Sequence, residues 1–540
     1  MADPAPPVTL PNSEWIELKN VSATSVDLTN WRIGDAAGQS GPLPAYLLQP
    51  DSFVIVCSAG AQQNMAAFGQ AISVSGFPSL NNEGEVIFVR AANGSIIHAV
   101  DYSSGWYRNE LKRNGGWTLE MIDTKNPCAG SDNWAASVNP RGGTPGAKNS
   151  IDGTSPDLTS PQLKYAYAMD SLTIVAVFDE PLDSFSAALS SNYQIDGGLS
   201  VLRASPIDPL LVLVQLQLSA PLSANTVYNL TANNITDCSG NVIKAPGKRN
   251  VGMAVDASAA DIVINEILFD PRPNAYDYVE FYNKSNKIID VSRLFVANRS
   301  SSGTVSSIEP IFSTPYDMFP GDYLVITENA TSLKTNSLVK NPDAIFELPS
   351  LPSYPDDEGD VILLNSQGSI VDEVKYSRDW QFRLINDPEG VSLERIDPFH
   401  ASQDATNWHS AASTAGYGTP GYKNSQYEPA VLIDATVDIA QKIFSPDNDG
   451  HDDVAVVRYK MSEPGYVANL TIFDALGQPV RRLVNNDVLG ITGKWNWDGL
   501  DDNGNKLPIG IYIIYTEIFN LQAKHRQFRN AIVLARSLKQ

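Results

Sequence analysis

An internal repeat constrains the fold of this chain more than any other feature of its sequence. Residues 14–33, EWIELKNVSATSVDLTNWRI, align without gaps with residues 277–296, DYVEFYNKSNKIIDVSRLFV. Three further pairs of segments follow in the same order: 81–89 with 356–364, 116–123 with 390–397, and 133–150 with 407–425. Self-similarity at one spacing is the signature of a repeated structural unit. The sequence therefore predicts two domains, residues 1–150 and 261–425, that share one plan.

The two copies begin differently. The second copy opens with DIVINEILFDPRP at residues 261–273, whereas MADPAP at the start of the chain matches only the ILFDPRP portion. We therefore expect the first domain to lack its first strand. We interpret Met1 as an internal methionine or an imposed chain boundary, with the strand and any export signal lost ahead of it.

The local pattern is that of β-strands. Segments such as SFVIVC, DYLVIT and DVILL alternate or run apolar with β-branched and aromatic residues, and Gly, Pro, Asn and Asp separate them at short intervals. A length of 540 residues predicts about three to five domains. Short strands with turn signals at this spacing are typical of sandwiches. The predicted fold is all-β, with tandem Ig-like β-sandwich domains in an extended arrangement.

The charge of the chain excludes one class of partner, and its hydropathy excludes a membrane-spanning segment. Asp and Glu number 61 against 38 Lys and Arg, for a net charge of −23. Because nucleic-acid binding relies on clustered Lys and Arg, we expect no nucleic-acid partner. No stretch of the sequence approaches 18 uninterrupted apolar residues, so we expect no membrane-spanning segment.

The repeated segments resemble the lamin tail domain, an immunoglobulin-like sandwich. The resemblance rests on INEI (264–267), on EWIEL and DYVEFYN, and on the closing NW…GTPG..NS pattern of both copies. It implies a secreted or surface protein in bacteria, in which such domains serve targeting or adhesion, and it brings no catalytic residues. We expect the closing Trp134 and Trp408 to be buried core residues.

Two further segments resemble other extracellular sandwiches. Residues 155–255, with FDEPLD and DCSGN, are similar to bacterial Ig-like domains of surface and S-layer-type proteins. Residues 432–540, with WNWDGLDDNGNKLPIGIYIIY, resemble the Ig-like domain of the flagellar hook-capping family and the C-terminal domains of Bacteroidetes type IX secretion proteins. We expect Asp237 and Asn241 to form an Asx-type turn around Gly240, with a contribution to calcium binding as the alternative.

One acidic turn is a candidate metal site. The segment FSPDNDGHDD brings Asp447, Asp449, Asp452 and Asp453 close together around Gly450. Calcium takes oxygen ligands, and alternating Asp and Asn around a Gly turn can deliver several of them to one point. No Glu stands at the twelfth position of an EF-hand counted from Asp447, which excludes a full EF-hand. We predict a looser Ca²⁺ site at these four aspartates, with a solvated acidic loop as the alternative.

Three cysteines leave two alternatives. An odd number means that at least one thiol is unpaired within the chain. Cys57 lies in the apolar run SFVIVC, Cys128 in a loop and Cys238 in the DCSGN turn. A bridge between Cys57 and Cys128 within the first domain is one expectation, and three free thiols are the other.

No catalytic motif is present. The sequence has no G-x-S-x-G elbow, no phosphate-binding GxxxxGK[ST] loop and no cysteine–histidine signature. The sequence leaves open whether two carboxyl groups are paired for glycoside hydrolysis, because the distance between them is set by the three-dimensional structure. We expect no catalytic residue and no cofactor other than Ca²⁺.

The expected function is therefore that of a non-enzymatic protein, extracellular or on the outer cell surface of a Bacteroidetes-type bacterium. It would act in adhesion, surface-complex assembly or scaffolding, with surface proteins or extracellular polysaccharide as partners, bound through exposed loops. Two alternatives stay open. The chain could be the accessory region of a secreted hydrolase whose catalytic domain lay upstream, or a carbohydrate-binding module that uses Trp106, Tyr107 or Trp380.

Overall fold

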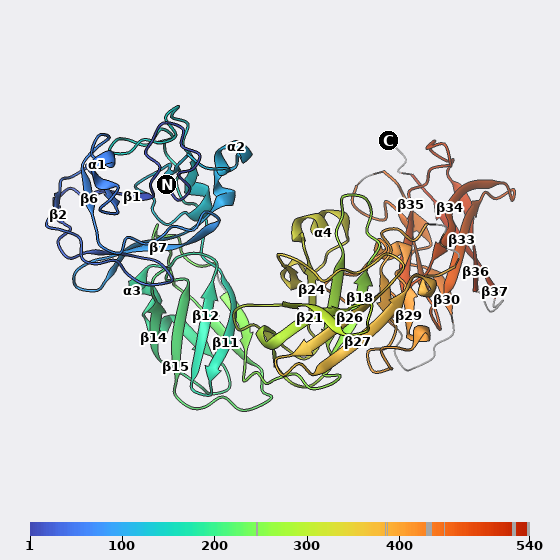
Figure 1. Cartoon of the computed structure of the whole chain (residues 1–540). Helices are drawn as coiled ribbons and strands as arrows, with labels where there is room; N and C mark the ends of the chain where they lie inside the picture. The colour runs from blue at the N-terminus through green and yellow to red at the C-terminus, as the bar shows by residue number, and fades with distance from the viewer. Residues whose placement is uncertain are drawn as a thin grey trace. The chain divides into compact units, whose positions relative to one another are not determined.

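The computed structural model describes residues 1–244, 247–383, 385, 387–427, 435–447, 449–520 and 525–536. The prediction of an all-β fold is confirmed, since sheets make up nearly all of the regular structure (Figure 1). Every sheet of the described residues lies inside one of the four segments singled out in the sequence. By compactness, the chain divides into an N-terminal unit, Met1–Met253, and a C-terminal unit, Ala254–Gln540.

The N-terminal unit begins with the first repeat domain, residues 1–150. Its strands pair in the orders β1-β5-β6, β3-β7-β8, β2-β4 and β10-β9. Their bounds are β1 (Trp15–Lys19), β2 (Val26–Asp27), β3 (Arg32–Gly34), β4 (Leu47–Leu48), β5 (Phe53–Cys57), β6 (Ala71–Ser73), β7 (Gly84–Arg90), β8 (Ile96–Ser103), β9 (Leu119–Met121) and β10 (Trp134–Ala136). The short helices α1 (Gln62–Met65) and α2 (Glu110–Arg113) lie in its connections.

The intervening domain, residues 155–255, completes this unit with two sheets, in the orders β11-β12-β15-β14 and β13-β16-β17. Its elements are β11 (Leu163–Asp170), β12 (Thr173–Phe178), α3 (Ser184–Ala187), β13 (Tyr193–Ile195), β14 (Val201–Ile207), β15 (Leu213–Leu218), β16 (Tyr228–Ala232) and β17 (Gly247–Val251). The strand β16 alternates buried and half-buried residues, and Tyr228 and Leu230 enter the core that both sheets share. This alternation is what a sheet with one covered face requires.

The second repeat domain, residues 261–425, opens the C-terminal unit with a six-stranded sheet in the order β25-β24-β19-β18-β28-β29. All seven residues of β18, IVINEIL, are buried, because this strand lies inside the sheet and is covered on both faces. The strands are β18 (Ile262–Leu268), β19 (Tyr278–Asn283), β20 (Ile289–Asp290), β21 (Leu294–Arg299), β22 (Val305–Pro310), β23 (Asp317–Met318), β24 (Tyr323–Thr327), β25 (Ile345–Glu347), β26 (Glu358–Asn365), β27 (Ile370–Ser377), β28 (Leu393–Arg395) and β29 (Trp408–Ser410), with helix α4 (Ala330–Asn336).

The two repeats differ at this central strand. In the first repeat, β1 and β9 match β19 and β28, yet β1-β5-β6 and β10-β9 are separate sheets. Within residues 1–150, all of which the structure describes, no strand joins these two sheets. The sheet of the first repeat is therefore split where the second repeat has β18.

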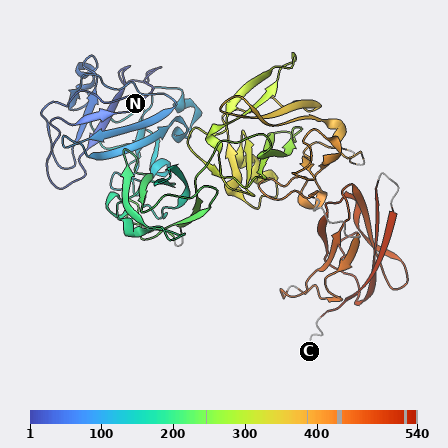
Figure 2. The same ribbon diagram turned by 90° about the horizontal axis from the view of Figure 1, so that it is seen from below.

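The C-terminal domain packs a three-stranded sheet, β30-β32-β35, and a five-stranded sheet, β31-β37-β36-β33-β34, around one core (Figure 2, orange to red). The strand β36 alternates strictly, so that Tyr512, Ile514 and Ile518 are buried while Ile511 and Ile513 are exposed. Its strands are β30 (Thr436–Ile439), β31 (Ile443–Phe444), β32 (Ala455–Lys460), β33 (Tyr466–Phe473), β34 (Pro479–Val488), β35 (Thr492–Trp497), β36 (Gly510–Asn520) and β37 (His525–Leu534). None of the helices among the described residues is long and apolar enough to cross a membrane.

Candidate functional site

The predicted calcium turn lies between β31 and β32 of the C-terminal domain. Carboxylate oxygens of Asp447, Asp449 and Asp453 lie within 4.8 Å of one another. The backbone N–H of Gly450 donates to Asp453 over 2.8 Å. Asp452, the fourth residue of the prediction, is not part of this group, because its backbone takes a left-handed φ of +51° and its carboxylate lies 3.4 Å from the His451 ring.

Three converging carboxylates can supply part of the oxygen shell that calcium needs. The same oxygens also accept backbone hydrogen bonds inside the turn, as when His451 donates to Asp449 over 2.8 Å. Turn formation alone therefore accounts for the geometry, and calcium binding at Asp447, Asp449 and Asp453 stays a prediction.

The turn around Gly240 has the predicted Asx geometry. The Oδ1 atom of Asp237 accepts from the backbone N–H groups of Ser239 and Asn241, each over 2.8 Å. The Asn241 amide also donates to Asp237 Oδ2 over 2.8 Å. The prediction of a hydrogen-bonded turn by Asp237 and Asn241 is confirmed.

A second acidic group forms where the intervening domain meets the first repeat. Oxygens of Asp157, Glu180 and Asp237 lie within 4.8 Å of one another. Burial, followed by the charges of Asp157 and Asp237, raises the pKa of Glu180 to about 7. The Oδ2 atom of Asp157 is buried and lacks a hydrogen-bond partner among the described residues. Sequence inspection singled out Asp237 alone, because the three carboxylates come together only in the folded chain.

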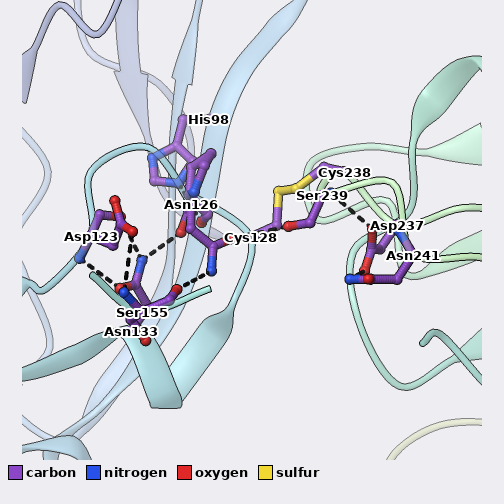
Figure 3. Close-up of a disulfide and its surroundings, with 11 residues drawn as sticks. His98, Asp123, Asn126, Cys128, Asn133, Ser155, Asp237, Cys238, Ser239 and Asn241 are labelled. Atoms are coloured by element: carbon purple, nitrogen blue, oxygen red, sulfur yellow. Dashed lines mark hydrogen bonds between the residues drawn. A yellow bond between two sulfur atoms is a disulfide. The ribbon is translucent and has the colours of Figure 1, made fainter. Parts of the chain in front are cut away.

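A disulfide lies beside this group and joins the two domains of the N-terminal unit (Figure 3). Cys128, in the loop after β9, is bonded to Cys238, with 6.1 Å between their Cα atoms and a sequence separation of 110. The neighbouring residues add contacts across the same junction, since the Ser239 hydroxyl donates to Asn126 over 3.0 Å. The amide of Asn126 in turn donates to the Ser155 carbonyl over 2.6 Å. The junction is thus fastened by one covalent bond and a short chain of hydrogen bonds.

Both expectations for the cysteines were wrong. Cys57, the last residue of β5, is fully buried in the core of the first repeat, so its sulfur cannot reach a surface loop. Cys128 lies in a loop that faces the intervening domain, where Cys238 occupies the second position of the DCSGN turn. The sequence signal for this pairing was that both residues lie in turn-rich segments, whereas Cys57 lies in an apolar strand.

The first repeat also contains a cavity of about 460 Å³, lined mainly by apolar side chains. All residues of β1 and of β9 line this cavity, and the edges of the two strands face each other across it. Other residues of its lining are Met1, Leu28, Trp31, Phe53, Val89, Tyr102, Trp134, Thr144 and Asn149.

In the second repeat, three fully buried glutamates meet around β18. They are Glu266, Glu280 and Glu394, each with 0% exposure. Glu394 accepts hydrogen bonds from the hydroxyls of Thr419 and Ser425 and from the backbone of Gln426. None of the three side chains reaches the surface, and their hydrogen bonds to residues 419–426 hold the sheet and the closing loop together.

Burial raises the pKa of each of these three glutamates, that of Glu394 to about 8. Between pH 4.5 and 8 the folded state then binds more protons than the unfolded state, so stability declines as pH rises. For the full chain we expect the free energy of unfolding of the C-terminal unit to fall by ~2 kcal/mol or more from pH 5 to pH 8. Urea unfolding at several pH values would measure it. Glu394→Gln should flatten the slope, and an equal slope in that variant would contradict the assignment.

The aromatic residues considered for carbohydrate binding pack inward. The rings of Trp106 and Trp134 lie 6.4 Å apart, and those of Trp380 and Trp408 lie 6.3 Å apart in the same arrangement. Tyr107 is 7% exposed and Trp408 3%, which confirms the core position predicted for Trp408. The same prediction was wrong for Trp134, which is only partly buried and lines the cavity of the first repeat. These pairs are a shared feature of both repeats, and Trp106 and Trp380 pack against the core of their own repeat.

Comparison with solved structures gives weak similarity throughout. The chain is similar to the N-terminal part of the bacterial S-layer protein SbsC, with 17% identity, a TM-score of 0.17, and coverage of 31% of this chain and 40% of that one. A DUF4876 family protein from Bacteroides thetaiotaomicron VPI-5482 has 13% identity, a TM-score of 0.18 and coverage of 42% and 86%. Dimeric latent PorU from Porphyromonas gingivalis has 8% identity, a TM-score of 0.16 and coverage of 75% and 35%.

The chain spans 40% to 55% of the length of the first three surface-layer structures it matches. No curated protein matches its sequence significantly. The resemblances of residues 432–540 to hook-capping and type IX domains stay predictions. The resemblance of the repeats to a known family is confirmed, because two regions of the chain, residues 1–104 and 256–378, match the family model of the Lamin Tail Domain.

Proposed function

We propose that this protein is a non-enzymatic scaffold of the outer cell surface or the extracellular space. The observation that carries the proposal is the disulfide between Cys128 and Cys238. Disulfides persist in secreted and surface proteins and are rare in the reducing cytosol. A bond that joins two domains, rather than closing a loop inside one, serves to fix their junction.

The other features support a role in binding and assembly. Buried residues form continuous cores in the intervening domain, the second repeat and the C-terminal domain, so these sandwiches act as rigid supports for their connecting loops. A net charge of −23 favours surface proteins or polysaccharide over nucleic acid as partners. Adhesion and the assembly of surface complexes are the activities that such a support serves best.

Two measurements on intact source cells test the location: surface labelling of lysines and a count of free thiols. A membrane-impermeant biotin reagent applied to whole cells should label the lysines of this chain. Alkylation of the denatured protein should modify one thiol, that of Cys57, when no reductant is present. After reduction, it should modify all three cysteines of the chain. Three free thiols before reduction, or protection of the lysines until the cells are lysed, would place the protein inside the cell and refute the proposal.

A further inference from the structure

Four half-buried tyrosines gather at one end of the strands β19 and β24 in the second repeat. Tyr282 of β19 and Tyr323 of β24 are a cross-strand pair whose ring centroids lie 4.8 Å apart. Burial, together with neighbouring groups that include Tyr427, raises the pKa of both hydroxyls, so Tyr427 lies beside this pair. Tyr422 precedes Tyr427 in the same loop after β29. We call Tyr282, Tyr323, Tyr422 and Tyr427 the tyrosine patch.

Two lysines lie on rings of the tyrosine patch. The Nζ atom of Lys423 lies 3.9 Å from the centroid of the Tyr427 ring, and that of Lys340 lies 3.9 Å from the centroid of the Tyr422 ring. Among the described residues, neither ammonium group has a carboxylate partner. An ammonium group on an aromatic face keeps its charge, so both lysines can still pair with an anion.

The first repeat neutralises the matching lysine within the domain. Lys148, the counterpart of Lys423, lies 2.7 Å from the carboxylate of Asp152. Asp152 stands at the position that Tyr427 has in the second repeat. The second repeat therefore has an aromatic ring where the first repeat has the acid, and this exchange leaves the charge of its lysine unpaired.

The groups below the tyrosine patch do not cancel these positive charges. Glu280 acts on both Tyr323 and Tyr422, so it lies beneath the patch. Burial raises the pKa of Glu280 well above its ordinary value and that of Glu394 to about 8. Both carboxyl groups are therefore mostly protonated at pH 7, because burial favours the neutral form.

The hydroxyls of the four tyrosines are open to a ligand. None of them has a hydrogen-bond partner among the described residues, and none is an orphaned buried group. A tyrosine hydroxyl can both donate and accept, while its ring presents an apolar face. Rings that pack on C–H groups, hydroxyls that bond other hydroxyls and two free cations together fit a sugar chain that carries acids.

We propose that the tyrosine patch, together with Lys340 and Lys423, binds a carboxylated polysaccharide. Its sugar rings pack on the tyrosine rings, and its carboxylates pair with the two lysines. An acidic polypeptide would use the lysines alone, so the four tyrosines favour the sugar. The proposal deepens the scaffolding function, on which it rests for its cellular setting, by naming the partner and the site that binds it.

The test uses the purified full chain and three polymers, with EDTA present to remove divalent cations. Polygalacturonate supplies sugars with carboxylates, its fully methyl-esterified form supplies the same sugars without charge, and polyglutamate supplies carboxylates without sugars. In calorimetric titrations at pH 7, polygalacturonate should bind with saturation and about tenfold more tightly than either control. Its binding should weaken as the salt concentration rises, because salt screens exposed charges.

Four variants locate the binding. Tyr427→Asp gives Lys423 the acid partner that the first repeat has, and it should weaken polygalacturonate binding about tenfold. Lys423→Gln, at an exposed position, should have a similar effect without disturbing the fold. Tyr323→Phe removes one hydroxyl and should weaken binding several-fold. Asp152→Asn breaks the matching ion pair of the first repeat and should leave binding unchanged. Thermal unfolding of each variant checks that the domain is intact.

Three results would overturn the proposal. Polyglutamate binding as tightly as polygalacturonate would assign the lysines to acidic polypeptides instead. Equal binding of the esterified polymer, or no binding of polygalacturonate, would exclude a carboxylated sugar. Binding that both Tyr427→Asp and Lys423→Gln leave unchanged would exclude this site. None of these results depends on where the protein resides, so they are distinct from failure of the proposed function.

Discussion

Removing the disulfide should cost the N-terminal unit about 4–5 kcal/mol of unfolding free energy. The bond between Cys128 and Cys238 closes a loop with a sequence separation of 110, and cross-links of that span restrict the unfolded chain by about this amount. Cys128→Ser, Cys238→Ser and the double variant should all be destabilised equally, because each of them removes the same single bond. Urea unfolding of the full chain, followed by tryptophan fluorescence, measures the effect.

Reduction of the wild-type chain provides the matched control. It should lower the stability of the N-terminal unit to that of the serine variants and leave the variants themselves unchanged. The transition of the C-terminal unit, which contains no cysteine, should not move. Additive losses in the double variant, or a loss below about 1 kcal/mol, would show that the bond does not restrain the unfolded chain as the loop length requires.

The second large effect is expected at a buried ion pair in the second repeat. Arg395 is 0% and Asp372 8% exposed at their side chains, and Nη1 of Arg395 lies 3.3 Å from the carboxylate. The same Nη1 donates to the Ile264 carbonyl of β18 over 2.8 Å. Arg395→Met should destabilise the C-terminal unit by about 3–5 kcal/mol, because it leaves a buried carboxylate without its cation.

The first repeat indicates how the loss of stability in Arg395→Met can be reduced. At the positions that match Arg395 and Asp372 it has Met121 and His98, so that neither charge is present. Arg395→Met combined with Asp372→Asn should therefore be more stable than Arg395→Met alone, since the asparagine retains an acceptor for the Ile264 N–H without a buried charge. Chemical denaturation of the three variants tests this. A double variant less stable than both single variants would show that the pair is not the source of the loss.

The outcome at the acidic turn shows what local sequence can predict. Asp447, Asp449 and Asp453 converge because residues a few positions apart around a glycine are brought together by the turn itself. Asp452 does not join them, since its direction depends on a left-handed backbone conformation that the residue type does not dictate. The Asp237–Asn241 turn was predicted correctly for the same local reason.

The repeat and the alternation of apolar residues determined, by themselves, the all-β fold and the kinship of residues 1–104 and 256–378, because strand periodicity and self-similarity are properties of the sequence. Only the tertiary structure decided which cysteines pair and that Asp157, Glu180 and Asp237 meet. It likewise decided that the place of the first strand, which the repeat comparison predicted to be missing from residues 1–150, is a cavity between β1 and β9. Each of these features depends on distances between residues far apart in the sequence, and those distances are set by how sheets and domains pack, which no local pattern encodes.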